Sequence, residues 1–271
     1  FLLKMEFTSQ LEACEVIDSS SKIDPSANIA DDVRVGPWCI IGENVTIGAG
    51  SVLDSHIVIR ANTRIGQNNR FFQFSSVGED PADKKFEGEE TWLDIGDDNI
   101  FREGVTLHRG TGIGSGTTRI GSDNLMMPYV HIAHDCIIGD HTVCANNVGI
   151  SGHVQVGDWA ILGGYAGVNQ FLKIGSHAMV GGMTHITNDI PAYIIVSGRP
   201  ASVRSVNAIG LERRGFDKDT ITEIREAFKI IYKRNYSLQE AIDQIKAMQK
   251  NCDALQVLIE SLESSEKGIH R

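Results

Sequence analysis

The chain has 271 residues, of which 41% are hydrophobic and 22% are charged, a composition typical of folded globular proteins rather than disordered ones. Its net charge of −10 argues against a nucleic-acid-binding protein, because such proteins usually present a broad basic face. The sequence has no apolar run of the roughly 20 residues that a transmembrane helix requires, so we expect no integral membrane segment.

The first 22 residues do not follow the pattern of the rest of the chain, and we treat 1–22 as an N-terminal extension. Their apolar run is too short for a signal peptide, and no small-residue cleavage pattern follows it. None of the five cysteines belongs to a C-x-x-C pair: Cys14, Cys39, Cys136, Cys144 and Cys252. An odd number of unpaired cysteines favours reduced thiols and therefore a cytoplasmic protein.

An aliphatic or aromatic residue recurs every six positions through most of residues 23–197. The first run comprises Ile23, Ile29, Val35, Ile41, Ile47, Leu53, Ile59, Ile65, Phe71 and Val77, and continues with Ile95, Phe101 and Leu107. The second run comprises Ile120, Met126, Ile132, Ile138, Cys144, Ile150, Val156, Leu162, Val168, Ile174, Val180 and Ile186. A period of six fits neither an amphipathic helix nor a simple strand alternation, but it is a known repeat of parallel β-helices.

We therefore predict a mainly β fold for residues 23–197, in which three six-residue units make one triangular coil of 18 residues. The first residue of each unit points into the prism, and Gly, Asn or Asp occupies the tight corners. The backbone of each coil pairs with the coils on either side. Two stretches that break the repeat, near 79–94 and 111–119, are predicted to be external loops, which often carry function on rigid scaffolds.

Residues 198–271 are predicted to form a connector and a small C-terminal α-helical domain. The first long helix begins with Asp217 or Asp219 as its cap, and apolar residues then recur at spacings of three and four. Ser237 and Glu240 form a capping box before a second helix, and a third follows near the C-terminus. We expect these helices to cover the last coil, whose open edge would otherwise invite association.

A coil of 18 residues converts sequence separation into spatial proximity. His134 should lie beside Gly152, eighteen residues later, and Asp135 should lie beside His153 in the same way. The same arithmetic groups six residues at one outward-facing corner: His131, His134, Asp135, Gly152, His153 and Gln170. Such a concentration of histidines with a carboxylate and a glycine makes this corner the main candidate site.

Three interpretations of this corner are open. The polar side chains can simply be solvated, because corners face water. His131, His134 and His153 can bind zinc, provided that three ligands converge at about 2.0–2.3 Å. Alternatively, His134 with its neighbouring carboxylate acts as a general base, and the backbone N–H of Gly152 stabilises an oxyanion. The grouping of a base with an oxyanion donor favours the third interpretation.

Five stretches of sequence together resemble one enzyme family. They are HRGT (108–111), HIAHDC (131–136), ANNVGISGHV (145–154), NQF (169–171) and GLERRGF (210–216). In this order they are similar to the UDP-N-acetylglucosamine acyltransferases of lipid A biosynthesis, and the resemblance covers residues 22–271.

The resemblance implies a homotrimer of left-handed β-helices, each with a helical C-terminal domain. It implies transfer of a 3-hydroxyacyl chain from acyl carrier protein to the 3-hydroxyl, or a 3-amino group, of a UDP-N-acetylglucosamine-type sugar, the first step of lipid A biosynthesis. It implies no metal, and no cofactor other than the phosphopantetheine that carries the acyl group.

The resemblance also implies roles for individual residues. His134 would be the general base, Asp135 the carboxylate beside it, and Gly152 the donor to the oxyanion. Residues implied to line the sugar and acyl site or to contact the nucleotide and carrier protein are His131, His153, Gln170, Asp83, Lys85, Asn207, Arg213 and Arg214. Gly182 would limit the length of the acyl chain.

Three positions depart from the family pattern. Asn169 replaces a histidine, Ala82 a glutamine and Ile209 a glutamate, which predicts retained chemistry with altered sugar or nucleotide contacts. Other functions remain to be weighed: the related N-acyltransferase, which carries a large extra N-terminal domain, a carbonic-anhydrase-like metalloenzyme, and a non-catalytic β-helix scaffold.

Overall fold

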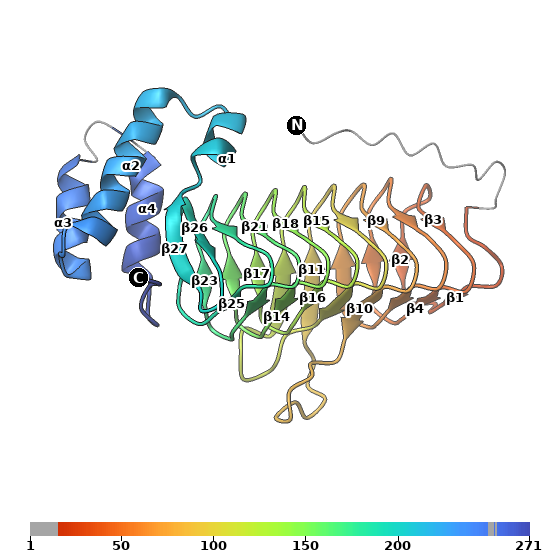
Figure 1. Ribbon diagram of the computed structural model, residues 1–271. Helices are drawn as coiled ribbons and strands as arrows, with labels where there is room; N and C mark the ends of the chain where they lie inside the picture. The colour runs from red at the N-terminus through yellow and green to blue at the C-terminus, as the bar shows by residue number, and fades with distance from the viewer. Residues whose placement is uncertain (1–15, 249–251, 253) are drawn as a thin grey trace.

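The computed structural model describes residues 16–248, 252 and 254–271. Its strands form three sheets that run side by side along a triangular prism, with the helices at one end (Figure 1). We call them the first, second and third sheets. The predicted parallel β-helix is therefore present, and the candidate site lies on the first sheet and on the corner between the first and second.

The strands are short because each one spans only a side of the triangle. The first sheet contains β1 (Lys22–Ile23), β4 (Ile40–Ile41), β7 (Val58–Ile59), β10 (Ser76–Glu79), β13 (Thr106–His108), β16 (His131–Ile132), β19 (Gly149–Ile150), β22 (Gly167–Val168) and β25 (His185–Ile186). The second contains β2 (Asn28–Ile29), β5 (Thr46–Ile47), β8 (Thr63–Ile65), β11 (Trp92–Ile95), β14 (Thr117–Ile120), β17 (Ile137–Ile138), β20 (Gln155–Val156) and β23 (Lys173–Ile174). The third contains β3 (Arg34–Val35), β6 (Val52–Leu53), β9 (Arg70–Phe71), β12 (Ile100–Phe101), β15 (Leu125–Met126), β18 (Val143–Cys144), β21 (Ile161–Leu162), β24 (Met179–Val180), β26 (Ile194–Ser197) and β27 (Ser202–Val206).

The register between coils follows the predicted spacing. His131 pairs with Gly149, and Gly149 with Gly167, so neighbouring strands are offset by eighteen residues. The offset is larger only where the chain leaves the prism, between Ser76 and Thr106 and between Thr106 and His131. The residues predicted to point inward form one continuous buried core, in which Phe71 and Phe101 stack with ring centroids 4.6 Å apart.

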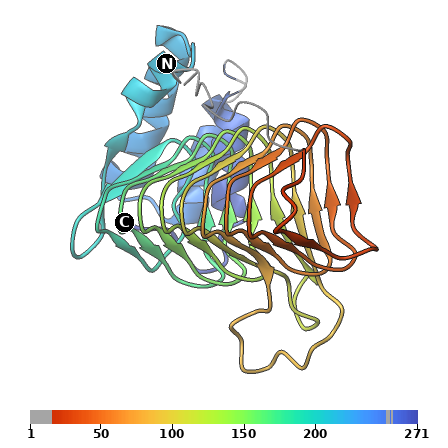
Figure 2. The same ribbon diagram turned by 90° about the vertical axis from the view of Figure 1, so that its right-hand side faces the viewer.

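The two excursions from the prism are shorter than predicted. Glu79 and residues 92–94, assigned to the first loop, belong to β10 and β11, and residues 117–119, assigned to the second, belong to β14. The strands extend into these segments because the neighbouring coils supply backbone partners for them. The loops hang from the same edge of the prism, side by side (Figures 1 and 2).

The C-terminal end differs from a simple connector. β26 pairs in parallel with β24, and β27 then turns back to pair antiparallel with β26. Arg204 of β27 donates from Nε to the Oγ of Ser197 across this hairpin, at 2.9 Å. A short helix α1 (Ala208–Arg213) follows. Part of the predicted connector is therefore an edge strand that closes the third sheet.

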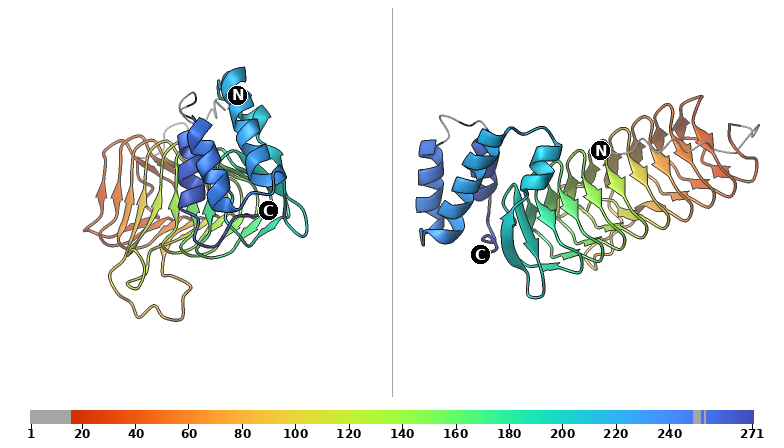
Figure 3. Two further views of the ribbon diagram at one scale, coloured as in Figure 1. Left: turned by 90° about the vertical axis from the view of Figure 1, so that its left-hand side faces the viewer. Right: turned by 45° about the horizontal axis from the view of Figure 1, so that its top comes forward.

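Three further helices pack against the last coil (Figure 3). They are α2 (Lys218–Lys233), α3 (Leu238–Met248) and α4 (Ala254–Glu263). Asp217 caps α2 by accepting from the Thr220 N–H, and Ser237 and Glu240 form the predicted capping box. Tyr193 of the last coil is buried among the helices, which confirms that they cover its end.

The prism begins before residue 23. Ile17 forms a bridge with Val35, and Lys22 pairs with Ile40 in the first sheet. Most of the predicted N-terminal extension, with Cys14, lies outside the described residues. Among the helices of the described part, none has the length and apolar character required to cross a membrane.

Candidate active site

A groove of about 330 Å³ is hollowed into the outer face of the first sheet. Its floor follows the register His131, Gly149, Gly167, His185, in which the two glycines lie between two histidines. A Cβ added to Gly149 would meet nothing within 4 Å, so the absence of side chains creates the space. The groove is lined by Ala82, His131, Ala133, His134, Gly149, Ile150, Ser151, Gly152, Gly167, Val168, Asn169 and His185.

His134 lies at the end of this groove, where the chain turns the corner after β16. Its Nδ1 is 2.9 Å from Oδ2 of Asp135. Since an ionised carboxylate can only accept, we assign the ring proton to Nδ1, which leaves Nε2 free to accept a proton. Asp135 has a φ of 57°, the left-handed conformation that aspartate tolerates better than most residues, and this conformation allows adjacent side chains to meet.

Gly152 lies directly against the His134 ring, as predicted from the spacing of 18. A Cβ on Gly152 would be 2.5 Å from Cε1 and 2.7 Å from Nε2 of His134. Glycine is therefore needed for the imidazole to occupy this position. Within the part of the chain that the structure describes, the Gly152 N–H makes no hydrogen bond. It is thus available to donate to a ligand.

The Asp135 carboxylate is enclosed by the second loop. It accepts from the Thr111 hydroxyl at 2.7 Å, from the Thr111 N–H at 3.1 Å and from the Ser115 N–H at 2.9 Å. Burial alone would raise the pKa of Asp135, but the hydrogen bonds from Thr111 and His134 outweigh it and hold the pKa below its ordinary value. The carboxylate is therefore ionised and fixed beside His134.

This enclosure corrects one expectation. The corner was predicted to face outward, yet the side chain of Asp135 is only 1% exposed. The covering loop is itself held by the first loop, because Glu89 accepts from the Gly112 N–H at 2.8 Å. Both excursions from the prism thus contribute to the position of the carboxylate.

Two further histidines line the site. His131 contacts the Thr106 hydroxyl through Nδ1 at 2.8 Å, and burial lowers its pKa. The ring of His153 packs edge-on against His134 at 5.0 Å between centroids and stacks on Phe171 at 4.4 Å. Burial also lowers the pKa of His153, against the opposing effect of Asp135. These rings therefore supply neutral donors and acceptors around the base.

His108 belongs to the site although it was not among the predicted site residues. Its ring packs edge-on against His131 at 4.8 Å, and its Nδ1 accepts from the Ala82 N–H at 3.4 Å. Burial lowers the pKa of His108 to about 4. Its proximity to His131 follows from the offset of 25 residues between Thr106 and His131, which could have been found only by counting across the second loop.

Sequence comparisons agree with this architecture. A family model of the bacterial transferase hexapeptide matches residues 16–49 and 117–152, and one for domain 2 of UDP-N-acetylglucosamine O-acyltransferase matches 189–270. The acyl-[acyl-carrier-protein]–UDP-N-acetylglucosamine O-acyltransferase of Saccharophagus degradans is 51% identical, covering 94% of this chain and 99% of that protein. The chain belongs to this acyltransferase family.

Solved structures of the family have the same fold. LpxA from Acinetobacter baumannii superposes with a TM-score of 0.93 at 53% identity, covering 95% of this chain and 100% of that one. UDP-N-acetylglucosamine O-acyltransferase (LpxA) from Moraxella catarrhalis gives 0.93 at 44% identity, with the same coverage of both chains. The predicted left-handed parallel β-helix with a C-terminal helical region is confirmed.

Several residues to which the family resemblance assigns a role lie elsewhere in this chain. Asn207 uses its side chain to cap α1 and to donate to the His177 carbonyl at 2.9 Å. Arg214 lies 3.2 Å from Nδ1 of His177 on the corner between the second and third sheets. Gly182 is at the corner between the third and first sheets and lines neither groove beside His134. A single chain does not bring these residues to His134.

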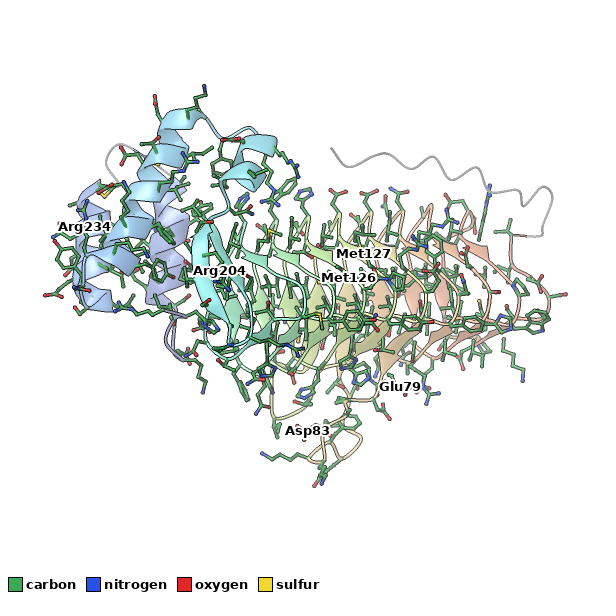
Figure 4. The ribbon with its side chains drawn as sticks, viewed as in Figure 1. Glu79, Asp83, Met126, Met127, Arg204 and Arg234 are labelled. Atoms are coloured by element: carbon green, nitrogen blue, oxygen red, sulfur yellow. The ribbon has the colours of Figure 1, made fainter. Side chains whose placement is uncertain are left out.

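Asp83 and Lys85 lie on the first loop, which also carries Ala82 into the groove. Figure 4 shows Asp83 on the part of the loop that extends beyond the prism. Its carboxylate accepts from the Lys85 N–H at 3.0 Å, and its charge acts to raise the pKa of His153. These residues therefore border the site rather than forming its floor.

A second, larger groove of about 1080 Å³ lies between the third sheet and the helical domain. Its walls combine apolar residues with arginines and lysines: Ile161, Met179, Ile195, Ile209, Phe228, Arg213, Arg225, Lys229, Lys233 and Arg234. Ile209, one of the departures from the family pattern, is 65% exposed there. Arg213 is therefore part of a basic groove and not of the histidine site.

The three-histidine zinc set is not formed. Of the described residues that could bind a metal, the cluster at this site comprises His134, Asp135 and His153, without His131. Nδ1 of His134 and both oxygens of Asp135 already take part in hydrogen bonds. The arrangement is thus better suited to orienting a histidine than to coordinating an ion.

Four cysteines of the described chain are free and buried: Cys39, Cys136, Cys144 and Cys252. Burial raises the pKa of both Cys136 and Cys144 to about 12, so neither is a reactive thiolate at neutral pH. Cys136 follows Asp135 in the sequence, but it belongs to the packing of the prism.

Proposed function

We propose that this chain transfers a 3-hydroxyacyl group from acyl carrier protein to the 3-hydroxyl of UDP-N-acetylglucosamine, the first step of lipid A biosynthesis. The observation that carries this proposal is the position of the His134 ring, which lies between the Asp135 carboxylate and the backbone of Gly152. This arrangement places a general base next to a free N–H donor, as acyl transfer requires.

In this reaction Nε2 of His134 removes the proton from the sugar hydroxyl, and the oxygen attacks the thioester carbon. The carbonyl becomes an oxyanion, which accepts a hydrogen bond from the Gly152 N–H. When the tetrahedral intermediate collapses, the C–S bond breaks and the phosphopantetheine thiolate takes the proton back from His134. Asp135 stabilises the imidazolium in between and is not itself protonated. The acyl group needs no covalent enzyme intermediate, metal or additional cofactor.

The assembly that fits this chemistry is a homotrimer. Asn207, Arg213, Arg214 and Gly182 lie on faces other than that of His134, so they reach the sugar, nucleotide or acyl chain only from a neighbouring subunit. The basic groove that contains Arg213 and Lys229 suits an acidic carrier protein and its phosphopantetheine phosphate. The buried, unreactive thiols suit a cytoplasmic enzyme.

The test is to incubate the purified chain with several acyl carrier proteins and UDP-sugars and to identify products by mass spectrometry. We expect O-acylated UDP-N-acetylglucosamine, and His134→Ala should lower kcat by roughly two to four orders of magnitude. Turnover of His134→Ala close to that of the wild type would refute the assignment of the base. Activity that required stoichiometric zinc and was lost on chelation would favour the metalloenzyme instead.

The 3-amino sugar is a second acceptor to include. Ala82 and Asn169, both departures from the family pattern, line the groove beside His134 and so border the space for the sugar. The ratio of kcat/KM for the 3-hydroxyl and 3-amino acceptors measures their effect. A non-catalytic scaffold would show no product with either, and no thermal shift with the nucleotide sugar.

A further inference from the structure

A polar groove of about 470 Å³ continues from the active site toward the C-terminal end of the prism. It is lined by Ser151, Asn169, Gln170, Leu172, Thr187 and Lys267. Ser151 and Asn169 line the His134 groove as well, so the two spaces adjoin. The only charged side chain among the described residues that line the second space is that of Lys267, which comes from the C-terminal tail.

The tail is held against the prism by hydrogen bonds that centre on Asp189. This carboxylate accepts from the Ser265 hydroxyl at 2.7 Å, and the Asp189 N–H donates to the Gly268 carbonyl at 3.0 Å. The His270 N–H donates to the Asp189 carbonyl at 3.0 Å, and the Asn188 side chain donates to the Lys267 carbonyl at 3.2 Å. The backbone of Lys267 is thus fixed on both sides by a buried anchor.

A row of side chains connects His134 to Lys267. The ring of His134 contacts that of His153 at 5.0 Å, His153 stacks on Phe171 at 4.4 Å, and Nζ of Lys267 lies 5.8 Å from the Phe171 ring. Gln170 is two coils from His134, which corresponds to about 10 Å at the usual spacing between strands. The ammonium group therefore lies beyond the base, along the same corner.

The charge of Lys267 is not neutralised within the described chain. Its side chain is exposed, and the structure gives it only the contact with Phe171. The neighbouring Glu266 is directed to Lys173, 3.8 Å away. In a chain with a net charge of −10, a fixed and unpaired cation next to polar amides and hydroxyls is suited to a phosphate group.

We propose that Lys267, together with Ser151, Asn169, Gln170 and Thr187, forms a phosphate subsite of the acyltransferase site. The inference rests on the proposed function, because both substrates of that reaction carry phosphate. In the sugar nucleotide, the diphosphate is attached two ring carbons away from the carbon that bears the 3-hydroxyl. When that hydroxyl is at His134, the diphosphate must lie beyond the sugar. The phosphodiester of phosphopantetheine has the same chemistry and is the other possible source.

The test compares Lys267→Ala and Lys267→Arg with Lys22→Ala, which removes an exposed lysine from β1, at the opposite end of the prism (Figure 1). Steady-state kinetics give KM for UDP-N-acetylglucosamine and for acyl carrier protein separately, and calorimetry gives Kd for UDP and for free phosphopantetheine. We expect Lys267→Ala to raise KM and Kd for one phosphate ligand about tenfold, as for a lost charge-assisted hydrogen bond, with kcat changed less than about twofold. Lys267→Arg and Lys22→Ala should stay close to the wild type.

The pattern of effects identifies the source. A change in Kd for UDP alone assigns the subsite to the nucleotide diphosphate, and a change for phosphopantetheine alone assigns it to the acyl donor. The effect should shrink between 50 mM and 500 mM salt, because the interaction is electrostatic. Asp189→Asn, which weakens the anchor of the tail, should shift the same Kd in the same direction.

Two results would overturn the subsite. Unchanged Kd values for both UDP and phosphopantetheine in Lys267→Ala would exclude phosphate binding at this residue. A higher KM for acyl carrier protein with both Kd values unchanged would mean that Lys267 contacts the carrier surface instead. A wild-type chain that binds UDP but transfers no acyl group would contradict the proposed function, while the binding measurements would still decide on the subsite.

Discussion

The hydroxyl of Thr111 donates to Oδ2 of Asp135 at 2.7 Å, and the same oxygen is 2.9 Å from Nδ1 of His134. The second loop is thus connected to the proposed base through a single carboxylate oxygen. Thr111 touches no part of the groove that would hold substrate. We therefore regard it as a positioning residue, whose effect on the reaction passes through Asp135.

Thr111→Val removes this hydroxyl with little change of shape. We expect kcat to fall about ten- to a hundredfold, since a hydrogen bond to a charged group is lost, while KM changes little. The acid limb of the pH profile of kcat/KM should move to higher pH, because a carboxylate with one donor fewer attracts the imidazole proton more strongly. Thr111→Ser keeps the donor and should retain most activity. Equal kcat and pH profiles in Thr111→Val and the wild type would show that the clamp has no catalytic effect.

Gly152 provides a test of the geometry around His134. A methyl group at this position would lie 2.5 Å from Cε1 of the ring, so Gly152→Ala must displace the base. Since a misplacement of about 1 Å can cost on the order of a hundredfold in rate, we expect kcat to fall by that factor without loss of folding.

Gly149→Ala is the matched control for this variant. It adds the same methyl group to the same groove, at a position where nothing lies within 4 Å. It should raise KM by filling substrate space and leave the position of His134 unchanged. If both variants lowered kcat equally, the contact between Gly152 and the imidazole would not explain the effect.

The contact between His134 and Gly152 could be predicted from the sequence, whereas the clamp on Asp135 could not. His134 and Gly152 are exactly one uninterrupted coil apart, so the period of six determines that they meet. Thr111 reaches Asp135 from an excursion of the chain whose path depends on tertiary contacts, including that of Gly112 with Glu89. A repeat predicts what lies inside its period, and side chains supplied by interruptions of the repeat fall outside it.

The C-terminal part shows the same limit. The caps at Asp217 and at Ser237 are local patterns, and both were predicted. The strand β27 pairs antiparallel with β26, although the sequence at this point had left the six-residue period. Its position is set by the free edge of β26 and the helices beside it, which no local pattern encodes.

Two buried histidines should make the stability of the fold depend on pH. Burial lowers the pKa of His108 and of His177 to about 4, against about 6.5 in an unfolded chain. Between these values the unfolded chain binds more protons than the folded one, so the free energy of unfolding should fall as the pH is lowered from about 6.5 to about 4. Above pH 6.5 this contribution should be constant.

Urea denaturation at pH 7 and at pH 5 measures this dependence. His177→Gln should reduce the difference in the free energy of unfolding between the two pH values, because one of the two groups no longer titrates. Replacement of the exposed His185 by Gln serves as the control. A difference that is as large in His177→Gln as in the wild type would contradict the assignment.

Met126 and Met127 are adjacent in the sequence and face opposite sides of the prism wall (Figure 4). Met126 is fully buried in the core, at an inward position of the repeat, whereas Met127 is partly exposed. Met126→Ala should therefore lower the free energy of unfolding by about 2–5 kcal/mol, through the lost burial and the cavity left behind. Met127→Ala should lower it by no more than about 1 kcal/mol. Denaturant unfolding of the two variants measures the contrast, and equal losses would mean that inward and outward positions of the repeat are not distinguished by packing.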